Sequence, residues 1–284
     1  MSAKGADLSG IDPAMRAGVL VEALPYIRRF ADATVVVKFG GNAMVDPELS
    51  HQFAADIVLM RAVGLKPVVV HGGGPQIGEL MARLGKEPEF RDGLRVTDAE
   101  TLDIARMVLD GRVNREIVAA INQHDHHAVG VSGEDAGLIV ARQRDPALGY
   151  VGDVVDVNRS ILDTLLAGGF IPVISTIGAD SGGQALNINA DSAAIAIAAA
   201  VGAEKLIYLT DVPGVLTDVA DPTSLVSRLS ATRARLLVAD RVVSGGMIPK
   251  VEACLAAIDQ GVPSAHVLDG RIPHVVLLEL FTDA

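Results

Sequence analysis

The sequence predicts an α/β fold built on an open, mostly parallel sheet, and three observations lead to this prediction. Short apolar segments rich in Val and Ile alternate with longer segments of helical periodicity from about residue 35 onward. That alternation is typical of parallel strands joined by helices. The composition agrees, with 50% hydrophobic residues, 29 glycines and 3% aromatic residues. Finally, two of the apolar segments are followed within three residues by a run of glycines, as strands that lead into ligand-binding loops often are.

The overall composition narrows the class of protein. A chain of 284 residues can bury a substantial core as one large or two modest domains. The formal charge of −11 argues against general nucleic-acid binding, which needs a basic surface. The most apolar stretch, Ala193–Val201, is too short to span a bilayer, and the start of the chain lacks a signal-peptide pattern. We expect a cytoplasmic protein with no membrane or nucleic-acid partner, in which the single Cys254 is a core thiol.

A helix is predicted near the N-terminus, after a flexible lead over residues 1–10. Asp12 can cap this helix, and Pro13 suits its first turn. Apolar residues recur at helical spacing as far as Pro25, which we expect to kink the helix. The apolar stripe packs either on its own domain or against another subunit, and the sequence leaves both possibilities open.

Strands and helices then follow one another in pairs. The first half predicts strands at 35–38 and 67–71 and helices at 47–63, 75–84 and 98–123. Short strands at 128–131, 137–142 and 151–155 are interpreted as a hairpin region covering a pocket. The second half predicts strands at 170–175, 185–188, 206–211 and 265–268, and helices from residue 189 or 191 to about 202, at 231–239 and at 248–260. Because no low-complexity linker separates the halves, we expect them to share one sheet.

The two glycine-rich loops are the strongest functional signal. Val35–Val37 leads into Lys38 and Gly40-Gly41, and Val68–Val70 leads into His71 and Gly72–Gly74. Glycine allows backbone N–H groups to approach an anion, so the two loops indicate sites for the two ends of a phosphoryl transfer. Neither loop is a P-loop, and a dinucleotide-binding fingerprint fails because Ile77 stands in the place of its last glycine. Plain tight turns are the alternative.

Ligands of an open parallel sheet bind at the carboxyl ends of its strands. There the sequence places Lys38, His71, Asn187–Asp191 and Thr210-Asp211. A lysine at the end of a buried strand suits a phosphate group. Lys250 lies in the first turn of a predicted helix, where the free N–H groups also favour anions. A solvated surface position is the alternative for each lysine.

Other polar residues give weaker signals. Asn187, Asn189 and Asp191 alternate with apolar residues and would share one side of an extended segment. Arg95 either makes two parallel hydrogen bonds to a carboxylate or lies solvated on the surface. The histidine-rich segment 124–127 has weak metal-ligand geometry, so we interpret it as a polar loop and predict no protein-held metal site.

Five segments together resemble the motifs of the N-acetylglutamate kinases, within the amino acid kinase family. They are Val35–Asn42, His71–Gln76, Gly93–Thr97, Leu186–Asp191 and Gly245–Lys250, and they match in register from about residue 20 to the end. The resemblance implies a three-layer α/β/α sandwich with a central, mostly parallel sheet. It also implies a kinked N-terminal helix within 1–30, an N-acetylglutamate-binding lobe at 31–188 and an ATP-binding lobe at 189–284.

The resemblance also implies a role for individual residues. Lys38 and Lys250 would stabilise the transferring phosphoryl group, and Asp191 would hold both lysines in place. The acetylated substrate would contact Gly73, Gly74, Arg95, Asn187 and Asn189. The nucleotide would contact Gly40, Gly41, Thr210, Asp211 and Gly246.

The implied reaction moves the γ-phosphoryl group of ATP to the side-chain carboxylate of N-acetyl-L-glutamate, in the second step of arginine biosynthesis. A carboxylate with a pKa of about 4.3 is ionised at neutral pH, so no general base is required. The difficulty is that one anion must approach another. Lysines, glycine N–H groups and Mg²⁺ carried by ATP would offset this repulsion.

Regulation is implied by the same resemblance. Members with a leading helix of this kind are similar to the arginine-inhibited, hexameric type, a trimer of dimers in which helices of neighbouring dimers interlace. An L-arginine site would draw on Tyr26, Lys205, His266 and Glu279. If the chain ends at Ala284, the usual glycine-rich tail is missing and the arginine site would be weakened.

Two alternative functions remain at this point. Aspartate, glutamate, carbamate and uridylate kinases of the same superfamily share the pattern of glycines and lysines, although Arg95 and Asn187 suit a blocked amino acid. The other alternative is a nucleotide- or arginine-sensing protein without turnover. Both lysines and Asp191 are present, which favours a catalyst.

Overall fold

A parallel sheet forms the centre of the molecule in the computed structural model, which describes residues 10, 12–44, 46–212, 214–216, 221, 224–240, 243 and 245–282. Within these residues the sheet has six strands in the order β12-β11-β1-β2-β8-β5, and every neighbouring pair is parallel. The strands are β1 Thr34–Phe39, β2 Lys66–His71, β5 Ala128–Ser132, β8 Ile171–Ser175, β11 Lys205–Thr210 and β12 Ser264–Asp269. Because β1 pairs with both β2 and β11, the two halves of the chain share one sheet, as the sequence predicts.

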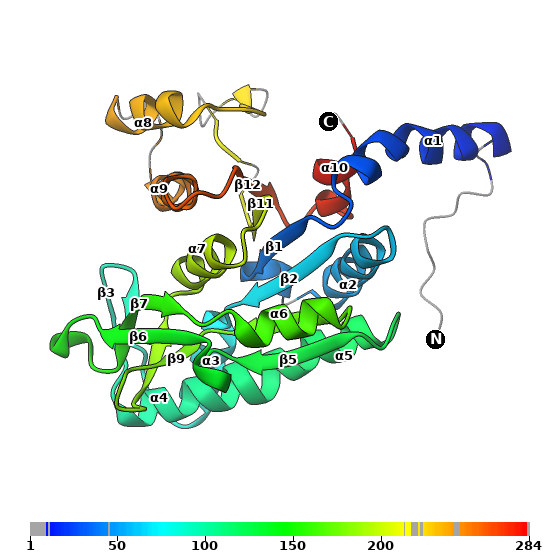
Figure 1. Ribbon diagram of the computed structural model, residues 1–284. Coiled ribbons are helices and arrows are strands. Elements are labelled where there is room, and N and C mark those ends of the chain that lie inside the picture. Colours follow the sequence, from blue (N-terminus) through cyan, green and yellow to red (C-terminus); the bar gives the residue numbers. More distant parts are fainter. Residues whose placement is uncertain are drawn as a thin grey trace.

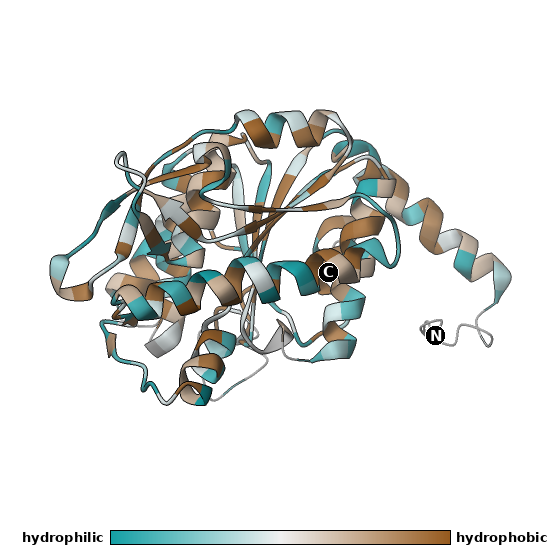
Figure 2. Cartoon of the chain, turned by 90° about the horizontal axis from the view of Figure 1, so that it is seen from below, coloured by the Kyte–Doolittle hydropathy of each residue, from teal (hydrophilic) through white to brown (hydrophobic). Residues whose placement is uncertain are grey.

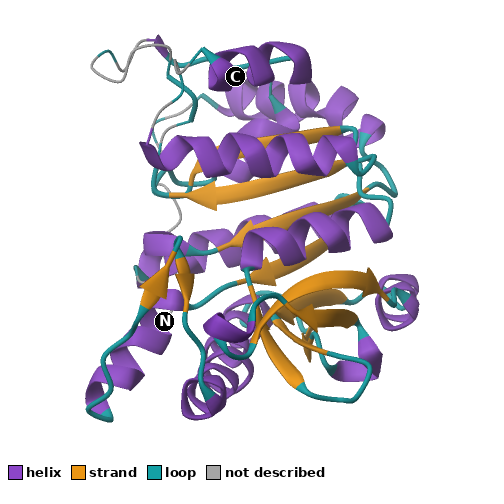
Figure 3. Ribbon diagram, turned by 90° about the vertical axis from the view of Figure 1, so that its left-hand side faces the viewer, coloured by secondary structure: helices purple, strands orange, loops and turns teal. Residues whose placement is uncertain are grey.

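Helices cover both faces of this sheet (Figures 1 and 3). Alternate residues of β1 show how the two cores divide: Val35 and Val37 pack on one face, and Val36 packs on the other. The first face is covered by α2 (Pro47–Ala62), α3 (Gly74–Arg83), α4 (Ala99–Arg106), α5 (Asn114–Asn122) and α10 (Val275–Phe281). The second is covered by α6 (Ser160–Ala167), α7 (Ala190–Ala200) and α9 (Ile248–Asp259). The prediction of a three-layer α/β/α sandwich is confirmed.

A second set of strands lies beside the main sheet. It consists of β6 (Ile139–Gln143), β7 (Val151–Val157), β9 (Ile177–Ala179) and β10 (Ala185–Ile188), which pair in a closed ring. The predicted hairpin region is correct for β6 and β7, which are antiparallel. It is wrong for β5, which pairs parallel with β8 at the edge of the main sheet. The crossover helix α5 precedes β5, and such a connection delivers a strand parallel to its neighbours.

The long helix predicted at 98–123 is interrupted. It starts as α4, widens into a π-helical segment at Met107–Val113 and continues as α5. Hydrophobic periodicity does not reveal such a segment, which frequently marks a functional site. The sequence also missed α6, α10, β9 and the small hairpin of β3 (Phe90–Arg91) and β4 (Leu94–Arg95). Helix α8 (Ala231–Ala239) packs beside α9 in a smaller core. Short turns at Gly41–Met44 (η1) and Gly245–Met247 (η6) contain predicted site residues.

The N-terminal helix α1 (Pro13–Arg29) extends away from the body of the molecule (Figures 1 and 2). The Asp12 side chain accepts a hydrogen bond from the Ala14 N–H at 3.1 Å, as a cap should. The helix continues through Pro25 as a single element. Its C-terminal end packs on the core, but four apolar residues in the first part are exposed: Met15, Val19, Leu20 and Val21. The flexible lead predicted over 1–10 lies almost wholly outside the described residues.

No helix in the described part of the chain is both long enough and apolar enough to cross a bilayer.

Candidate active site

A pocket of about 230 Å³ opens at the carboxyl ends of β1 and β2. Its wall is made by short segments that lie far apart in the sequence: the turns after these two strands, the β3–β4 hairpin and the end of β10. Predicted site residues in the wall are Lys38, Gly40, Gly41, Gly73, Gly74, Arg95, Asn187 and Asn189. The fold therefore brings together the whole predicted acceptor set, one of the two lysines and two of the nucleotide glycines.

Lys38 is held by an ion pair. It lies on the same face of β1 as Val36, which packs toward α7, and its Nζ is 3.0 Å from Oδ1 of Asp191 in the first turn of α7. The segment before α7 is extended only as far as Ile188. The prediction that Asn187, Asn189 and Asp191 share one side of a strand is therefore wrong for Asp191. The reason is that Asn189 starts the helix by accepting hydrogen bonds from two N–H groups of its first turn, those of Asp191 at 2.9 Å and Ser192 at 3.2 Å.

Lys250 reaches the same edge of the sheet from the first turn of α9. Its Nζ donates a hydrogen bond of 2.5 Å to Oγ1 of Thr210, the last residue of β11. Because β11 is the parallel neighbour of β1, both lysines stand at the carboxyl ends of adjacent strands. The Thr210 hydroxyl in turn donates to Oδ1 of Asp211 at 3.2 Å. Gly246 lies exposed in η6, the turn that leads into α9. The prediction that Asp191 holds both lysines stays a prediction, since Lys250 bonds to Thr210.

Within the turn Gly72–Gly74, the middle residue packs too closely for a larger side chain. A Cβ atom at Gly73 would lie 2.7 Å from Cδ2 of Leu109 in the π-helical segment. Helix α3 begins at Gly74, so its first N–H groups lack partners within the helix and favour an anion in the pocket. His71, at the end of β2, is completely buried. Burial lowers the pKa of His71 to about 4, so the imidazole is neutral at physiological pH and offers no charge to a ligand.

Arg95, on β4, is oriented by neutral partners. Its Nη2 donates to the Gly74 carbonyl at 2.9 Å, its Nη1 contacts Sδ of Met81 at 3.2 Å, and its guanidinium lies 4.7 Å from the centre of the Phe90 ring. Burial lowers the pKa of Arg95, but an arginine remains charged. With no carboxylate among these partners, its positive charge is available to an anionic substrate. Phe90 was not among the predicted site residues, because a lone aromatic residue in a loop has no distinctive pattern.

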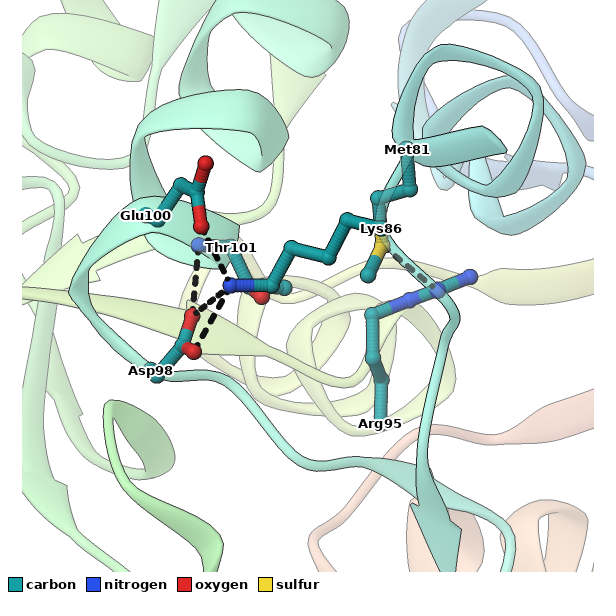
Figure 4. A network of polar contacts seen from close by, with 6 residues as sticks. All are labelled: Met81, Lys86, Arg95, Asp98, Glu100 and Thr101. Atoms are coloured by element: carbon teal, nitrogen blue, oxygen red, sulfur yellow. Dashed lines mark hydrogen bonds and ion pairs between the residues drawn. The ribbon is translucent and has the colours of Figure 1, made fainter. Parts of the chain in front are cut away.

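A polar network fixes the chain on either side of Arg95 (Figure 4). Lys86, after α3, donates to both carboxylate oxygens of Asp98, at 2.7 and 2.9 Å, and to Glu100 at 2.7 Å. Asp98 also caps α4 by accepting from the Thr101 N–H at 2.8 Å. These hydrogen bonds, that from Lys86 first, lower the pKa of Asp98 to about 2. The network ties the end of α3 to the start of α4 and so limits the position of the β3–β4 hairpin between them.

Comparison with known proteins identifies the family. Residues 33–269 match the amino acid kinase family. The chain belongs to that family. It is 55% identical over 271 residues to the acetylglutamate kinase of Nostoc punctiforme, covering 95% of this chain and 91% of that protein. It is 56% identical over 278 residues to the acetylglutamate kinase of Saccharopolyspora erythraea, with the same two coverages. These relatives group the chain with the acetylglutamate kinases, and the protein is an enzyme of the kinase class.

Solved structures agree with the family assignment. The N-acetylglutamate synthase of Neisseria gonorrhoeae, complexed with coenzyme A and N-acetyl-glutamate, matches with a TM-score of 0.82 and 28% identity. The match covers 94% of this kinase and 61% of the synthase, so the kinase spans under two thirds of that protein. The synthase complexed with coenzyme A and L-arginine matches with a TM-score of 0.76 and 26% identity, covering 94% of the kinase and 63% of the synthase.

The residues predicted for an arginine site also gather, but at the opposite end of the sheet. Lys205 starts β11, and its Nζ is 2.6 Å from Oε1 of Glu279 on α10. Nδ1 of His266 lies 3.0 Å from the same oxygen. Burial raises the pKa of Glu279, but the hydrogen bonds from His266 and Lys205 outweigh it and bring the value to about 2. Tyr26, near the end of α1, packs against the adjoining core.

The remaining candidates have structural roles in the kinase. His127 bonds to Asp125 through Nδ1 at 2.7 Å, and His124 lies against the ring of His51. Among the described residues, no three His, Cys, Asp or Glu side chains gather as metal ligands would. Cys254 packs against the α7 side of the core, and burial raises the pKa of its thiol to about 12, which makes it a poor nucleophile.

Proposed function

We propose that this kinase transfers the γ-phosphoryl group of ATP to the side-chain carboxylate of N-acetyl-L-glutamate. The observation that carries the proposal is the lining of the pocket, which combines Arg95 with Lys38 and the two glycine-rich turns. N-acetyl-L-glutamate has two carboxylates. Arg95 would bind the one that does not react, and the other would face Lys38 and the N–H groups of the Gly72–Gly74 turn. Asn187 and Asn189 would contact the acetamido group, which a free amino acid lacks.

The chemistry required is electrostatic rather than acid–base. The attacking carboxylate is already ionised, so the residues only have to bring two anions together and stabilise the charge on the transferring group. Lys38 lies on the acceptor side of this path, and Lys250, beside Thr210, lies on the nucleotide side. Gly40 allows the Lys38 ammonium group to lie close to the backbone, since a Cβ there would be 2.9 Å from Nζ.

Mg²⁺ is proposed as the cofactor, arriving on the phosphates of ATP. Mg²⁺ is usually bound through substrate phosphates and one or two carboxylates. Asp211, whose Oδ1 accepts from Thr210, offers a carboxylate next to the residue that binds Lys250, so the residues present fit this group. When bound, Mg²⁺ would neutralise phosphate charge. Thr210, Asp211 and Gly246 would contribute by orienting the nucleotide beside it.

The decisive experiment compares acceptors. ATP turnover should be fast with N-acetyl-L-glutamate and at least about a hundredfold slower with L-glutamate, L-aspartate or carbamate, because a missing acetamido group leaves the polar groups proposed to bind it without a partner. Hydroxylamine should trap the acyl phosphate as a hydroxamate. ADP release without hydroxamate, or a preference for an unacetylated acceptor, would overturn the proposal. Lys66→Ala, at the amino end of β2, is a control that should retain activity.

We also infer that L-arginine inhibits this kinase by binding near Lys205, His266 and Glu279. The support is the charged cluster that they form and the solved complex of the similar synthase with L-arginine. Glu279 would bind the guanidinium group in exchange for Lys205. Millimolar L-arginine should reduce turnover, and Glu279→Gln should abolish the inhibition while leaving uninhibited turnover unchanged. Turnover that does not respond to L-arginine would refute the proposed inhibition and leave the proposed reaction unaffected.

We also propose that the kinase forms a hexamer through contacts between the α1 helices of neighbouring dimers. The exposed apolar residues of α1 would be covered by the same helix of a neighbouring dimer. Sedimentation should give a hexamer, and Leu20→Glu combined with Val21→Glu should reduce it to dimers. Glu22→Gln on the same helix is the control. A hexamer that persists in the double variant would place the contact elsewhere.

A further inference from the structure

A chain of hydrogen-bonded side chains, which starts at the exposed Arg115 and continues through the buried Asn114 and His71, lies behind the Gly72–Gly74 turn. Nη2 of Arg115 donates to Oδ1 of Asn114. Nδ2 of Asn114 lies 3.1 Å from Nε2 of His71 and 2.8 Å from the Val173 carbonyl. Nδ1 of His71 is 3.0 Å from the Gly72 carbonyl. The side chains of His71 and Asn114 are inaccessible to solvent, with residue exposures of 0% and 1%, so both depend on these partners for hydrogen bonding.

The direction of every hydrogen bond in this chain follows from Arg115. A guanidinium group can only donate, so the amide oxygen of Asn114 must face it. The amide nitrogen of Asn114 then donates one proton to Val173 and the other to His71. Nε2 of His71 must therefore accept, which leaves the ring proton on Nδ1 and directs it to the Gly72 carbonyl. Burial keeps the ring neutral, with its pKa lowered to about 4, so this arrangement persists across the physiological pH range.

The Gly72 carbonyl matters because the turn borders a pocket for an anion. The other two carbonyls of the turn are also engaged: that of Gly73 accepts from the Ile77 N–H at 2.9 Å, and that of Gly74 accepts from Arg95 at 2.9 Å. A carbonyl released toward the pocket would repel a carboxylate or phosphoryl oxygen, whereas an N–H group attracts it. Glycine peptides can rotate easily, so a specific donor is needed to keep the Gly72 carbonyl in place.

We propose that Arg115, Asn114 and His71 are positioning residues, which hold the Gly72 carbonyl away from the pocket so that the turn presents N–H groups to the reacting carboxylate. They touch no substrate and act only through the turn. The inference rests on the proposed function of the pocket as an acceptor site. It adds to that function a set of hydrogen bonds, starting on α5, that determines which backbone groups the turn presents to the pocket.

Gly130 gives independent support. It is the central residue of the edge strand β5, where glycine is normally unfavourable. Its φ is not positive, so no turn conformation requires glycine there. A methyl group built on Gly130 would overlap both Oδ1 of Asn114 and Nη2 of Arg115. The glycine therefore makes room for the first hydrogen bond of the chain.

The first test determines directly which nitrogen of the His71 imidazole carries the proton. In the full-length protein labelled with ¹⁵N-histidine, NMR should show His71 as the neutral Nδ1–H tautomer, with the signal assigned by its loss in His71→Asn. In Asn114→Asp the carboxylate can only accept, so the proton should move to Nε2. A wild-type His71 with its proton on Nε2 would overturn the inference. This NMR measurement needs no substrate, so its result stays valid even if the acceptor proves to be another compound.

The second test reads catalysis with N-acetyl-L-glutamate and ATP. His71→Asn can keep a donor near the Nδ1 position and should retain most activity, whereas His71→Leu removes the donor and should lower kcat about tenfold to a hundredfold, the usual effect of losing a hydrogen bond to a critical group. The KM for ATP should stay within about twofold, which general unfolding would not spare. Equal loss in both variants would show that the donor is irrelevant and overturn the inference.

A third test uses a substitution outside the hydrogen-bonded series of Arg115, Asn114 and His71. Gly130→Ala should separate Arg115 from Asn114 and lower kcat several-fold, with the same shift of the His71 tautomer toward a mixture. Gly111→Ala is the matched control, since a Cβ there meets nothing within 4 Å, and it should leave kcat and the NMR signal unchanged. A Gly130→Ala enzyme that is folded by thermal unfolding yet fully active would also overturn the inference. If the wild-type enzyme has no activity with N-acetyl-L-glutamate, the proposed function is refuted, and the NMR test still decides the inference about the hydrogen bonds.

Discussion

The two lysines of the site stand at the same edge of the sheet but are held in different ways. Lys38, on the proposed acceptor side, faces a carboxylate, that of Asp191 at 3.0 Å. Lys250, on the proposed nucleotide side, faces the hydroxyl of Thr210 at 2.5 Å, and among the described residues it has no carboxylate within ion-pair distance. The charge of Lys38 is thus compensated by an ion pair, whereas the charge of Lys250 is not.

Removing either lysine should have the largest effect. Lys38→Ala or Lys250→Ala should lower kcat about a hundredfold to a thousandfold with little change in KM, because a preorganised donor to a developing charge contributes about 3–4 kcal/mol to the barrier. Steady-state kinetics with both substrates varied would measure this. Near-normal turnover in one variant would remove that lysine from the mechanism.

The difference between the lysines predicts unequal rescue. In Lys38→Ala the Asp191 carboxylate is left facing the incoming anions, so adding Asp191→Asn should restore part of the lost kcat. In Lys250→Ala no such carboxylate is released, and Asp191→Asn should restore nothing. If the second substitution helps both variants equally, the two sides do not differ in charge compensation as described.

The buried imidazole of His71 should also make the enzyme sensitive to acid. The folded-state pKa of His71 is about 4, below the ordinary value of 6.5. The unfolded chain therefore binds more protons between these values, and the free energy of unfolding should fall by up to about 3 kcal/mol as the pH drops from 6.5 toward 4. Urea unfolding at several pH values would measure the slope. His71→Asn should remove this component, and an unchanged slope would contradict the buried neutral imidazole.

Arg95 should affect binding more than turnover. Arg95→Ala should raise the KM for N-acetyl-L-glutamate about tenfold to a hundredfold, since hydrogen bonds to a charged group are worth about 1.5–3 kcal/mol. Arg95→Lys keeps the charge but not the forked geometry, so its KM should fall between those of the wild type and Arg95→Ala. A change in the KM for ATP of similar size would mean that Arg95 serves the nucleotide side instead.

Thr210 should give the smallest effect. Thr210→Val removes the hydroxyl that positions Lys250, and the loss of about 1 kcal/mol should raise the KM for ATP several-fold and leave that for the acceptor unchanged. Thr164→Val is the control, because the Thr164 hydroxyl bonds only to the backbone within α6. Identical kinetics in the two variants would show that the Thr210 hydroxyl does not hold Lys250 in solution.

The sequence predicted the strands of the shared sheet because these follow from local chemistry, whereas the proposed acceptor set came from the resemblance to known motifs. Val35–Val37 and Val68–Val70 are β-branched runs that end in glycine, and such runs form buried strands with little influence from the rest of the chain. The cap of α1 was equally local, since Asp12 and Pro13 are consecutive. Arg95 and Asn187 were found because recurring motifs contain them.

Sequence analysis missed the features that depend on contacts between residues far apart in the sequence. Asn114 looks like one more polar residue in a long helix, and nothing in its neighbourhood shows that it meets His71 and Val173. The partner of Lys250 depends on the register between β11 and the start of α9. The parallel edge position of β5 depends on a crossover that short strands do not encode. Periodicity identifies which face is apolar; it does not identify which buried polar groups find each other.

The central place of β1 has a consequence for how the enzyme is made. Its first partner, β2, leaves the ribosome soon after it, but its other partner begins only at Lys205. Until β11 has been synthesised, one edge of Val35–Val37 lacks its partner strand. Such an edge can pair with another nascent chain. Fragments that stop before Lys205 should therefore aggregate, and assembly of the full sheet should be slow because it joins ends of a long polypeptide.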